Sequence, residues 1–388
     1  MPVKNINPSV RSVGVLDKDR KLFDELIPLP DGTSYNSYLI IGSEKNALID
    51  TVYPAKKEEF IANIESLGLK KLDYIVCNHA EQDHSGSVSA LLELYKEAKV
   101  VTNTKCKDLL VSMVNIPEDK IVVVKDNETL SLGDKTLEFH LTPWVHWPDT
   151  MMTYLKEDKI LFSCDFLGAH IAADTLFMED EAGVYKPAKR YYAEIMMPFR
   201  IHIKKYIDKI KNMNVNIIAP SHGQIYPNPQ FILDAYKDWV SEDVKNEVII
   251  VYVSMYDSTK KMVNYLAESL RNKGLTVKPF NLIEGDIGEL AVDLVEASTV
   301  IIASPTVLSG AHPAVASVVF LINALRPKFK YAAIIGSYGW GGNMVDQIKG
   351  LLPNIKAEFL SPVLIKGCPK AKDFEALDSL VDEIIGRH

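Results

Sequence analysis

The sequence lacks the features that would point to a membrane, a secretory route or a nucleic acid. No apolar run approaches the roughly 18 residues of a membrane span, and the first residues, MPVKNINPSVRSVG, have no apolar signal core. The 43 basic residues against 51 acidic ones leave a formal charge of −8, which does not favour nucleic acid or an anionic membrane. We therefore expect a cytoplasmic protein with no nucleic-acid or membrane partner.

Cysteine is scarce and scattered. The four cysteines, Cys77, Cys106, Cys164 and Cys368, form no Cys-x-x-Cys pair. This spacing excludes a thiolate metal knuckle and a rubredoxin-like module within this chain. We expect the thiols to stay reduced, as is usual in the cytoplasm.

The 388 residues, 47% of them hydrophobic, leave room for two domains of ordinary size. In the first 247 residues, helical patterns near 54–67, 86–98 and 199–212 interleave with short β-rich runs at 38–41, 47–50, 74–77, 100–102, 121–124, 136–141, 153–155, 160–164 and 215–219. From Val248 strand and helix alternate, with strand candidates at 248–253, 275–279, 299–303, 331–335 and 358–363. This alternation predicts a doubly wound parallel sheet. The charged stretch 238–247 marks the boundary, which predicts domains 1–247 and 248–388.

Residues 79–84 crowd four potential metal ligands into six positions. They read His-Ala-Glu-Gln-Asp-His directly after an apolar strand, so His79, Glu81 and Asp83 can project to one side of an extended loop and His84 follows at a helix start. A polar helix N-terminus capped by Asp83 and Ser85 is the alternative. That alternative leaves both histidines and the glutamate unexplained.

Three further polar residues follow strand candidates. His146 follows the strand ending at 141, Asp165 directly follows the run 160–164, and His222 directly follows the run 217–221. Each alone is more often a satisfied polar residue than a ligand. Together with residues 79–84, however, they make seven donors that can hold two divalent ions if one carboxylate bridges. The hard oxygen donors favour iron or manganese over zinc, and so redox chemistry over hydrolysis.

The second half carries three loops at the carboxyl ends of strand candidates, where open α/β sheets bind ligands. The first loop, Ser254-Met255-Tyr256-Asp257-Ser258-Thr259, combines hydroxyls with the start of a helix, which is typical of an anion site, and it resembles the phosphate loop of flavodoxins. The absence of Gly-x-Gly-x-x-Gly favours FMN over FAD or NAD. The predicted FMN residues are Ser254, Met255, Tyr256, Asp257, Ser258 and Thr259; Pro305, Thr306, Val307 and Leu308; and Ser337, Tyr338, Gly339, Trp340, Gly341 and Gly342. Asp257 is expected to turn towards solvent, because a carboxylate beside a phosphate is unfavourable.

The spacing of the seven donors resembles the metallo-β-lactamase superfamily, except that Glu81 stands where that signature usually has histidine. The sequence also has Glu81, the Trp147-Pro148-Asp149 run and the stretch 163–170. With these features it resembles the flavodiiron protein family. The resemblance implies an N-terminal lactamase-like αββα sandwich, a C-terminal flavodoxin-like domain with FMN, and two irons per chain. One iron would take His79, Glu81 and His146, the other Asp83, His84 and His222, with Asp165 bridging.

The resemblance also implies an activity. The family reduces O2 to water, NO to N2O or both, with electrons that reach the irons through FMN from rubredoxin or reduced coenzyme F420. It implies a head-to-tail homodimer or a homotetramer, because one subunit's FMN then lies near the other's irons. His170 and one of Tyr191 and Tyr192, for which we take Tyr192, are the predicted catalytic residues beside the irons. A zinc hydrolase fused to a flavodoxin, and an electron carrier with an inactive lactamase-like scaffold, remain alternatives.

Overall fold

A computed structural model describes residues 3–388. Contacts within the chain define two compact units. One holds the residues up to Tyr192 together with Phe199–Val240, and the other holds Ala193–Pro198 and Ser241–His388. The domain boundary between residues 247 and 248 stays a prediction. None of the helices between residues 3 and 388 combines the length and apolar character that crossing a bilayer requires.

The first unit contains two sheets. Seven strands form the first sheet in the order β1 (Lys4–Asn5), β2 (Val10–Ser12), β7 (Tyr38–Ile41), β8 (Asn46–Ile49), β9 (Tyr74–Val76), β10 (Lys99–Thr102) and β11 (Ile121–Val123). Five strands form the second in the order β12 (Thr129–Ser131), β13 (Thr136–Leu141), β14 (Met151–Leu155), β15 (Ile160–Cys164) and β16 (Ile217–Pro220). Two small hairpins pair β3 (Val15–Asp17) with β6 (Thr33–Tyr35), and β4 (Leu22–Phe23) with β5 (Ile27–Pro28).

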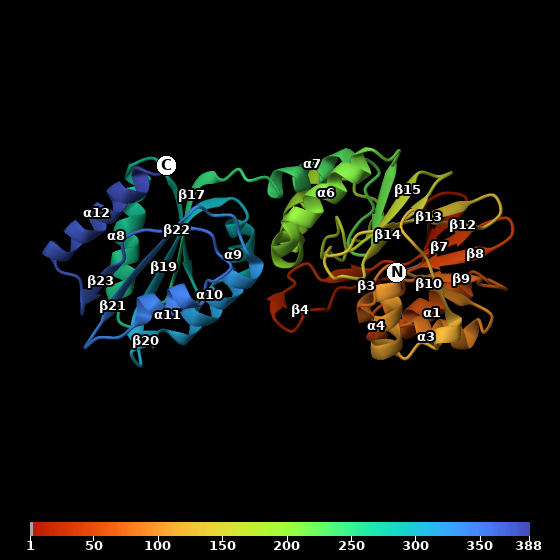
Figure 1. Ribbon diagram of the computed structural model, residues 1–388, viewed down its shortest axis with the longest axis horizontal. Helices are drawn as coiled ribbons and strands as arrows, with labels where there is room; N and C mark the ends of the chain where they lie inside the picture. Colours follow the sequence, from red (N-terminus) through yellow and green to blue (C-terminus); the bar gives the residue numbers. More distant parts are fainter. Residues whose placement is uncertain (1–2) are drawn as a thin grey trace. The chain divides into compact units, whose positions relative to one another are not determined.

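The two sheets pack face to face, with helices outside. One apolar core joins side chains of both sheets, and a second joins the first sheet to its helices. Every residue of β14 and β15 is buried, which is typical of strands covered on both faces. Figure 1 shows α6 and α7 along β14 and β15. The helices are α1 (Lys57–Ser66), α2 (Gln82–Ser85), α3 (Val88–Leu94), α4 (Thr104–Val114), α5 (Glu181–Tyr191), α6 (Arg200–Lys211) and α7 (Pro229–Trp239). The predicted αββα sandwich is confirmed.

The second unit is a parallel sheet wound on both faces. Its strands lie in the order β18 (Thr276–Asn281), β17 (Lys245–Tyr252), β19 (Ala297–Val307), β21 (Tyr331–Tyr338) and β22 (Glu358–Phe359), with β23 (Val363–Lys366) also beside β21 and β20 (Gly310–Ala311) beside β19. One face packs on α8 (Ser258–Asn272) and α12 (Phe374–Ile385), the other on α9 (Ile287–Leu294), α10 (Pro313–Leu325) and α11 (Met344–Gly350). The predicted flavodoxin-like fold is confirmed, and the direction of winding reverses between β17 and β19.

One predicted strand of this sheet is wrong in detail. The run 358–363 was expected to form a single strand, but the structure divides it into β22 and the start of β23. Pro362 lies in the interruption. Proline has no backbone N–H to donate to a sheet ladder, which explains the break.

Candidate metal centre and flavin pocket

The fold brings the seven predicted metal ligands together at one end of the first unit. His79 follows β9, Asp165 follows β15 and His222 follows β16, while Asp83 and His84 lie in α2 and His146 lies between β13 and β14. They form two groups with mutually close ligand atoms: His79, Glu81, His146 and Asp165; and Asp83, His84 and His222. Within each group these atoms lie within 4.8 Å of one another.

The first group surrounds one oxygen of Asp165. Nε2 of His79 lies 3.1 Å from Oε2 of Glu81 and 3.7 Å from Oδ2 of Asp165. Nε2 of His146 lies 3.3 Å and 3.6 Å from the same two oxygens. Two imidazole nitrogens and two carboxylate oxygens thus converge on one point.

The second group surrounds the other oxygen of Asp165. Nε2 of His84 lies 3.0 Å from Oδ1 of Asp165 and 3.4 Å from Oδ1 of Asp83. Nε2 of His222 lies 3.2 Å from Oδ1 of Asp165 and 3.2 Å from Oδ2 of Asp83. The two oxygens of one carboxylate therefore face two separate pairs of histidines.

The electrostatics of these groups favour a bound cation. Burial alone would lower the pKa of His84, but the carboxylates of Asp165 and Asp83 raise it to about 9. Burial would also lower the pKa of His222, but hydrogen bonds to the carboxylates of Asp165 and Asp83 raise it to about 10. Among the described residues, Nε2 of His84 and Oδ2 of Asp165 are buried without a hydrogen-bond partner. These donor atoms and this demand for positive charge fit two divalent metal ions.

Neighbouring groups orient the histidine rings through contacts with their Nδ1 atoms. Nδ1 of His79 lies 3.0 Å from Oδ2 of Asp149, which also accepts a hydrogen bond from the Ala80 N–H. Nδ1 of His222 lies 2.7 Å from the Ser34 carbonyl, to which it can only donate. Such contacts fix the tautomer and leave Nε2 free to bind a metal.

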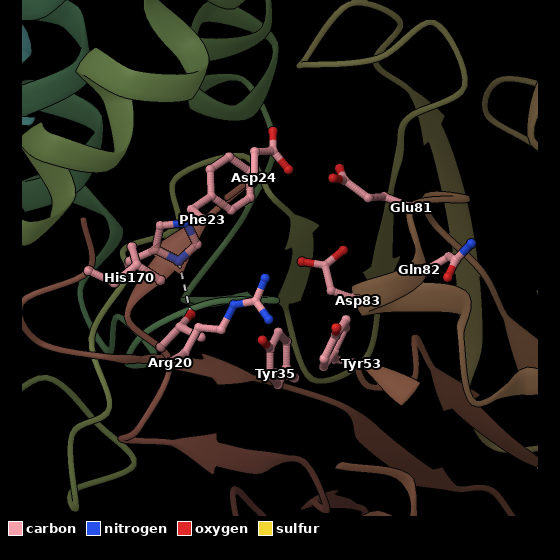
Figure 2. Close-up of a pocket in the computed structure, with 11 residues that line it drawn as sticks. Arg20, Phe23, Asp24, Tyr35, Tyr53, Glu81, Gln82, Asp83 and His170 are labelled. Carbon is pink, nitrogen blue, oxygen red and sulfur yellow. Dashed lines mark hydrogen bonds between the residues drawn. The ribbon is translucent and has the colours of Figure 1, made fainter. Parts of the chain in front are cut away.

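A cavity of about 120 Å³ opens beside this cluster. Figure 2 shows carboxylates of Asp24, Glu81 and Asp83, the guanidinium of Arg20 and the ring of His170 on its wall. The ring of His170 donates to or accepts from the Thr33 hydroxyl at 2.9 Å. Burial and the nearby His222 lower the pKa of His170 to about 3, so this ring is neutral near pH 7.

The two adjacent tyrosines point in different directions. The Tyr191 hydroxyl donates to Oδ1 of Asp165 at 3.0 Å, whereas the Tyr192 hydroxyl donates to the Trp239 carbonyl at 3.2 Å. The expectation that Tyr192 lies beside the metal ligands is thereby corrected in favour of Tyr191. The reason is local: α5 ends at Tyr191, and a π-helical turn over Tyr192–Met196 follows it.

A second cavity, of about 360 Å³, lies at the carboxyl end of the flavodoxin-like sheet. Hydroxyls gather at the start of α8, where the Thr259 and Ser337 oxygens lie 3.3 Å apart. Tyr256 and Trp340 flank the cavity with 87% and 86% of their surfaces exposed. A polar cradle at a helix N-terminus beside bare aromatic faces fits a phosphate joined to a flat ring.

Eleven of the predicted FMN residues line this cavity: Ser254, Met255, Tyr256, Ser258, Thr259, Pro305, Thr306, Ser337, Tyr338, Gly339 and Trp340. The other five predicted residues, Asp257, Val307, Leu308, Gly341 and Gly342, are outside that lining. Asp257 is exposed, and its φ of 60° places it in the left-handed region that favours glycine.

Several residues of both cavities were absent from the sequence prediction. Gly367, which follows β23, lines the second cavity, and Arg20, Phe23 and Asp24 line the first. Asp149, which supports His79, enters the sequence prediction only as part of the Trp147-Pro148-Asp149 run. Its place three residues after His146 is the one signal that could have marked it as a supporting carboxylate.

Comparisons with known families agree with this division. The model described as "ODP family beta lactamase" matches residues 33–223, and the flavodoxin model matches residues 250–377. A lactamase-like domain with a paired carboxylate–histidine site, joined to a flavodoxin domain, defines a class of iron- and flavin-dependent oxidoreductases.

Full-length relatives narrow this class. The chain is 36% identical to the nitric oxide reductase of Moorella thermoacetica over 92% of this chain and 91% of that protein. It is 34% identical to the coenzyme F420H2 oxidase of Methanothermobacter marburgensis over 90% of this chain and 89% of that protein. The structure of rubredoxin oxygen:oxidoreductase from Desulfovibrio gigas matches with a TM-score of 0.95 and 32% identity, covering 99% of this chain and 98% of that one.

The chain belongs to the flavodiiron protein family. Its cofactors are accordingly FMN and a non-haem diiron centre, and it is an oxidoreductase. These findings do not support the alternatives of a zinc hydrolase or of a carrier with an inactive scaffold.

Proposed function

We propose that this protein reduces O2 to water, NO to N2O or both, with electrons that pass through FMN to two irons. Rubredoxin and reduced coenzyme F420 are the proposed electron donors. The names of the relatives, one a nitric oxide reductase, one an F420H2 oxidase and one a rubredoxin oxidase, support both gases and both donors.

The ligand assignment rests on one observation, the division of the two Asp165 oxygens between two pairs of histidines. We assign His79, Glu81 and His146 to one iron and Asp83, His84 and His222 to the other, with Asp165 bridging. Two ferrous ions against three carboxylates leave a small positive charge, which suits a centre that changes oxidation state.

The surrounding residues hold this arrangement through hydrogen bonds. A bound diiron centre supplies electrons and open coordination positions for a small gas. Asp149 and the Ser34 carbonyl orient His79 and His222, while Tyr191 donates a hydrogen bond to the bridging carboxylate. His170, neutral and anchored on Thr33, is the proposed hydrogen-bonding residue on the cavity wall.

We propose that the cavity of the second unit binds FMN through its three loops. The hydroxyls of Ser254, Ser258 and Thr259 suit the phosphate, and Tyr338 and Trp340 suit the isoalloxazine ring. With the boundary placed at 247/248, the iron and flavin sites belong to separate domains. A head-to-tail homodimer or a homotetramer in the cytoplasm is the proposed assembly, because it brings one subunit's FMN to another's irons.

The proposal is tested by purifying the protein without oxygen and measuring metal and flavin. We expect two irons and one FMN per chain. Uptake of O2 and of NO is then followed separately with rubredoxin and with reduced F420. A protein that contains only zinc, or that consumes neither gas with either donor, would contradict the proposal.

A further inference from the structure

Redox-active aromatic side chains extend from the metal ligands to the surface of the first unit. Tyr191 contacts Asp165 through its hydroxyl, and the adjacent Tyr192 packs on Trp239 with ring centres 5.4 Å apart. Trp239 lies 5.5 Å from Tyr185 and donates its indole N–H to the Tyr185 hydroxyl at 3.2 Å. The first three rings are buried, whereas Tyr185 is 36% exposed.

The chemistry of this cluster is unusual for a core that serves packing alone. Tyr236 packs on both Tyr192 and Trp239, with ring centres 5.4 Å and 5.1 Å away. Tyrosine and tryptophan, unlike phenylalanine, can give up one electron at potentials that a protein can reach.

We propose that Tyr191, Tyr192, Trp239 and Tyr185, named here the aromatic chain, carry electrons from the surface to the metal centre when the flavin cannot supply them. The inference rests on the proposed function. Reduction of O2 to water needs four electrons, of which two ferrous ions give two and reduced FMN gives two. If O2 reacts while the flavin is oxidised, two electrons are missing, and the aromatic chain supplies them one at a time.

The aromatic chain moves electrons without moving protons at its buried end. Electrons pass from Trp239 towards the metal ligands through the rings of Tyr192 and Tyr191, and Tyr191 keeps its phenol proton in the hydrogen bond to Asp165. Tyr192 provides the ring contact to Trp239, with ring centres 5.4 Å apart. Trp239 can lose an electron and keep its N–H. Tyr185 finally gives up an electron and releases its proton to water, and a soluble one-electron donor such as ascorbate restores it with an electron and a proton.

The test uses the iron- and FMN-loaded protein in its oxidised state, mixed with hydrogen peroxide and a nitroso spin trap. Peroxide takes up two electrons and two protons to become two waters, and neither ferric iron nor oxidised flavin can provide those electrons. We expect a trap adduct at Tyr185, located by mass spectrometry. In Tyr185→Phe this adduct is lost and oxidation appears at Trp239, while O2 reduction with excess donor is unchanged.

A matched control is Tyr206→Phe, on α6, which should give the wild-type adduct at Tyr185. Trp239→Phe should give no adduct at Tyr185. If that variant does not fold, the comparison of the wild type with Tyr185→Phe decides. The proposal is overturned if iron-free protein gives the same adduct at Tyr185, or if adducts spread equally over all exposed tyrosines. Iron content and gas reduction are measured on the same sample. Intact gas reduction without the Tyr185 adduct overturns the aromatic chain alone, whereas absence of iron overturns the proposed function.

Discussion

At the scale of single residues, Asp165 is the position on which the metal site depends. One of its oxygens lies near Nε2 of His79 and His146, the other lies near Nε2 of His84 and His222, and the residue is buried. Removing it leaves two sets of ligands with no common carboxylate.

Asp165→Ala should therefore lose iron and reduce gas uptake to background, while FMN stays bound in the other unit. Metal and flavin analysis checks this. Asp234→Ala, an exposed aspartate on α7, is the matched control and should keep both irons. Gas reduction that survives in Asp165→Ala would show that the carboxylate does not bridge.

The metal-free protein should lose stability as pH rises from about 6.5 to 10. In the folded state the pKa values of His84 and His222 are raised to about 9 and 10, above the usual 6.5 of the unfolded chain. Their contribution is thus complete below pH 6.5 and disappears as pH passes through the raised values, a change on the order of a few kcal/mol.

Thermal unfolding of the metal-free protein at pH 6.5 and pH 10 measures this change. The iron-loaded protein is the control, because there metal replaces the protons and the dependence should largely vanish. A melting temperature of the metal-free protein that rises from pH 6.5 to pH 10 would contradict the predicted loss of stability.

Tyr191 and Tyr192 make a natural pair of matched variants. Tyr191→Phe removes a hydrogen bond to a carboxylate, an interaction that contributes about 1.5–3 kcal/mol, so gas reduction should fall about tenfold or more. Tyr192→Phe removes a bond to the Trp239 carbonyl and leaves the contact with Asp165 intact, so kcat should stay near wild type. Steady-state rates of gas reduction by both variants test this prediction. A slower Tyr192→Phe than Tyr191→Phe would contradict the placement of Tyr191 beside the metal ligands.

At the scale of elements, the sequence predicts what regular periodicity encodes. The seven ligands could be predicted, and the structure brings them together, because strands such as β9, β15 and β16 are clear apolar runs followed by polar residues. The N-terminal hairpins were missed, because strands of two or three residues such as β4 and β5 give no periodic signal. For that reason Arg20, Phe23 and Asp24 could not be assigned to the cavity.

Sequence periodicity could not decide between Tyr191 and Tyr192 for a different reason. Neighbouring residues on a helix point about 100° apart, so a small change in helical register decides which one faces the site. The π-helical turn after α5 makes such a change. Turns of this kind have no reliable sequence signature.

The turn between β17 and α8 should determine FMN affinity. Thr259→Ala removes a buried hydroxyl at the start of α8, next to Ser337. If that hydroxyl binds the phosphate, the loss is about 1.5–3 kcal/mol, and FMN should bind roughly ten to a hundred times more weakly. Titration of FMN-free protein with FMN measures this. Thr276→Ala, exposed on β18, is the control, and equal affinities in both variants would contradict the assignment.

At the scale of the whole molecule, the proposed iron and FMN sites lie in different compact units, and the proposed reaction passes electrons between two such sites. A variant that lacks iron but keeps FMN, such as Asp165→Ala, can therefore be combined with one that keeps iron but lacks FMN. For the second we choose Ser254→Ala combined with Thr259→Ala. Each variant alone has only one of the two cofactors and should be inactive.

Co-expression of these two variants, each with a different affinity tag, yields mixed dimers that can be isolated by two successive purifications. If electrons pass from the FMN of one subunit to the irons of its partner, each mixed dimer contains one complete pair and should show about half of the wild-type gas reduction. If electrons stay within one chain, no complete pair exists and the mixed dimer should be inactive. Wild-type chains carrying the same two tags are the control, and an inactive mixed dimer that retains iron and FMN would exclude the head-to-tail arrangement.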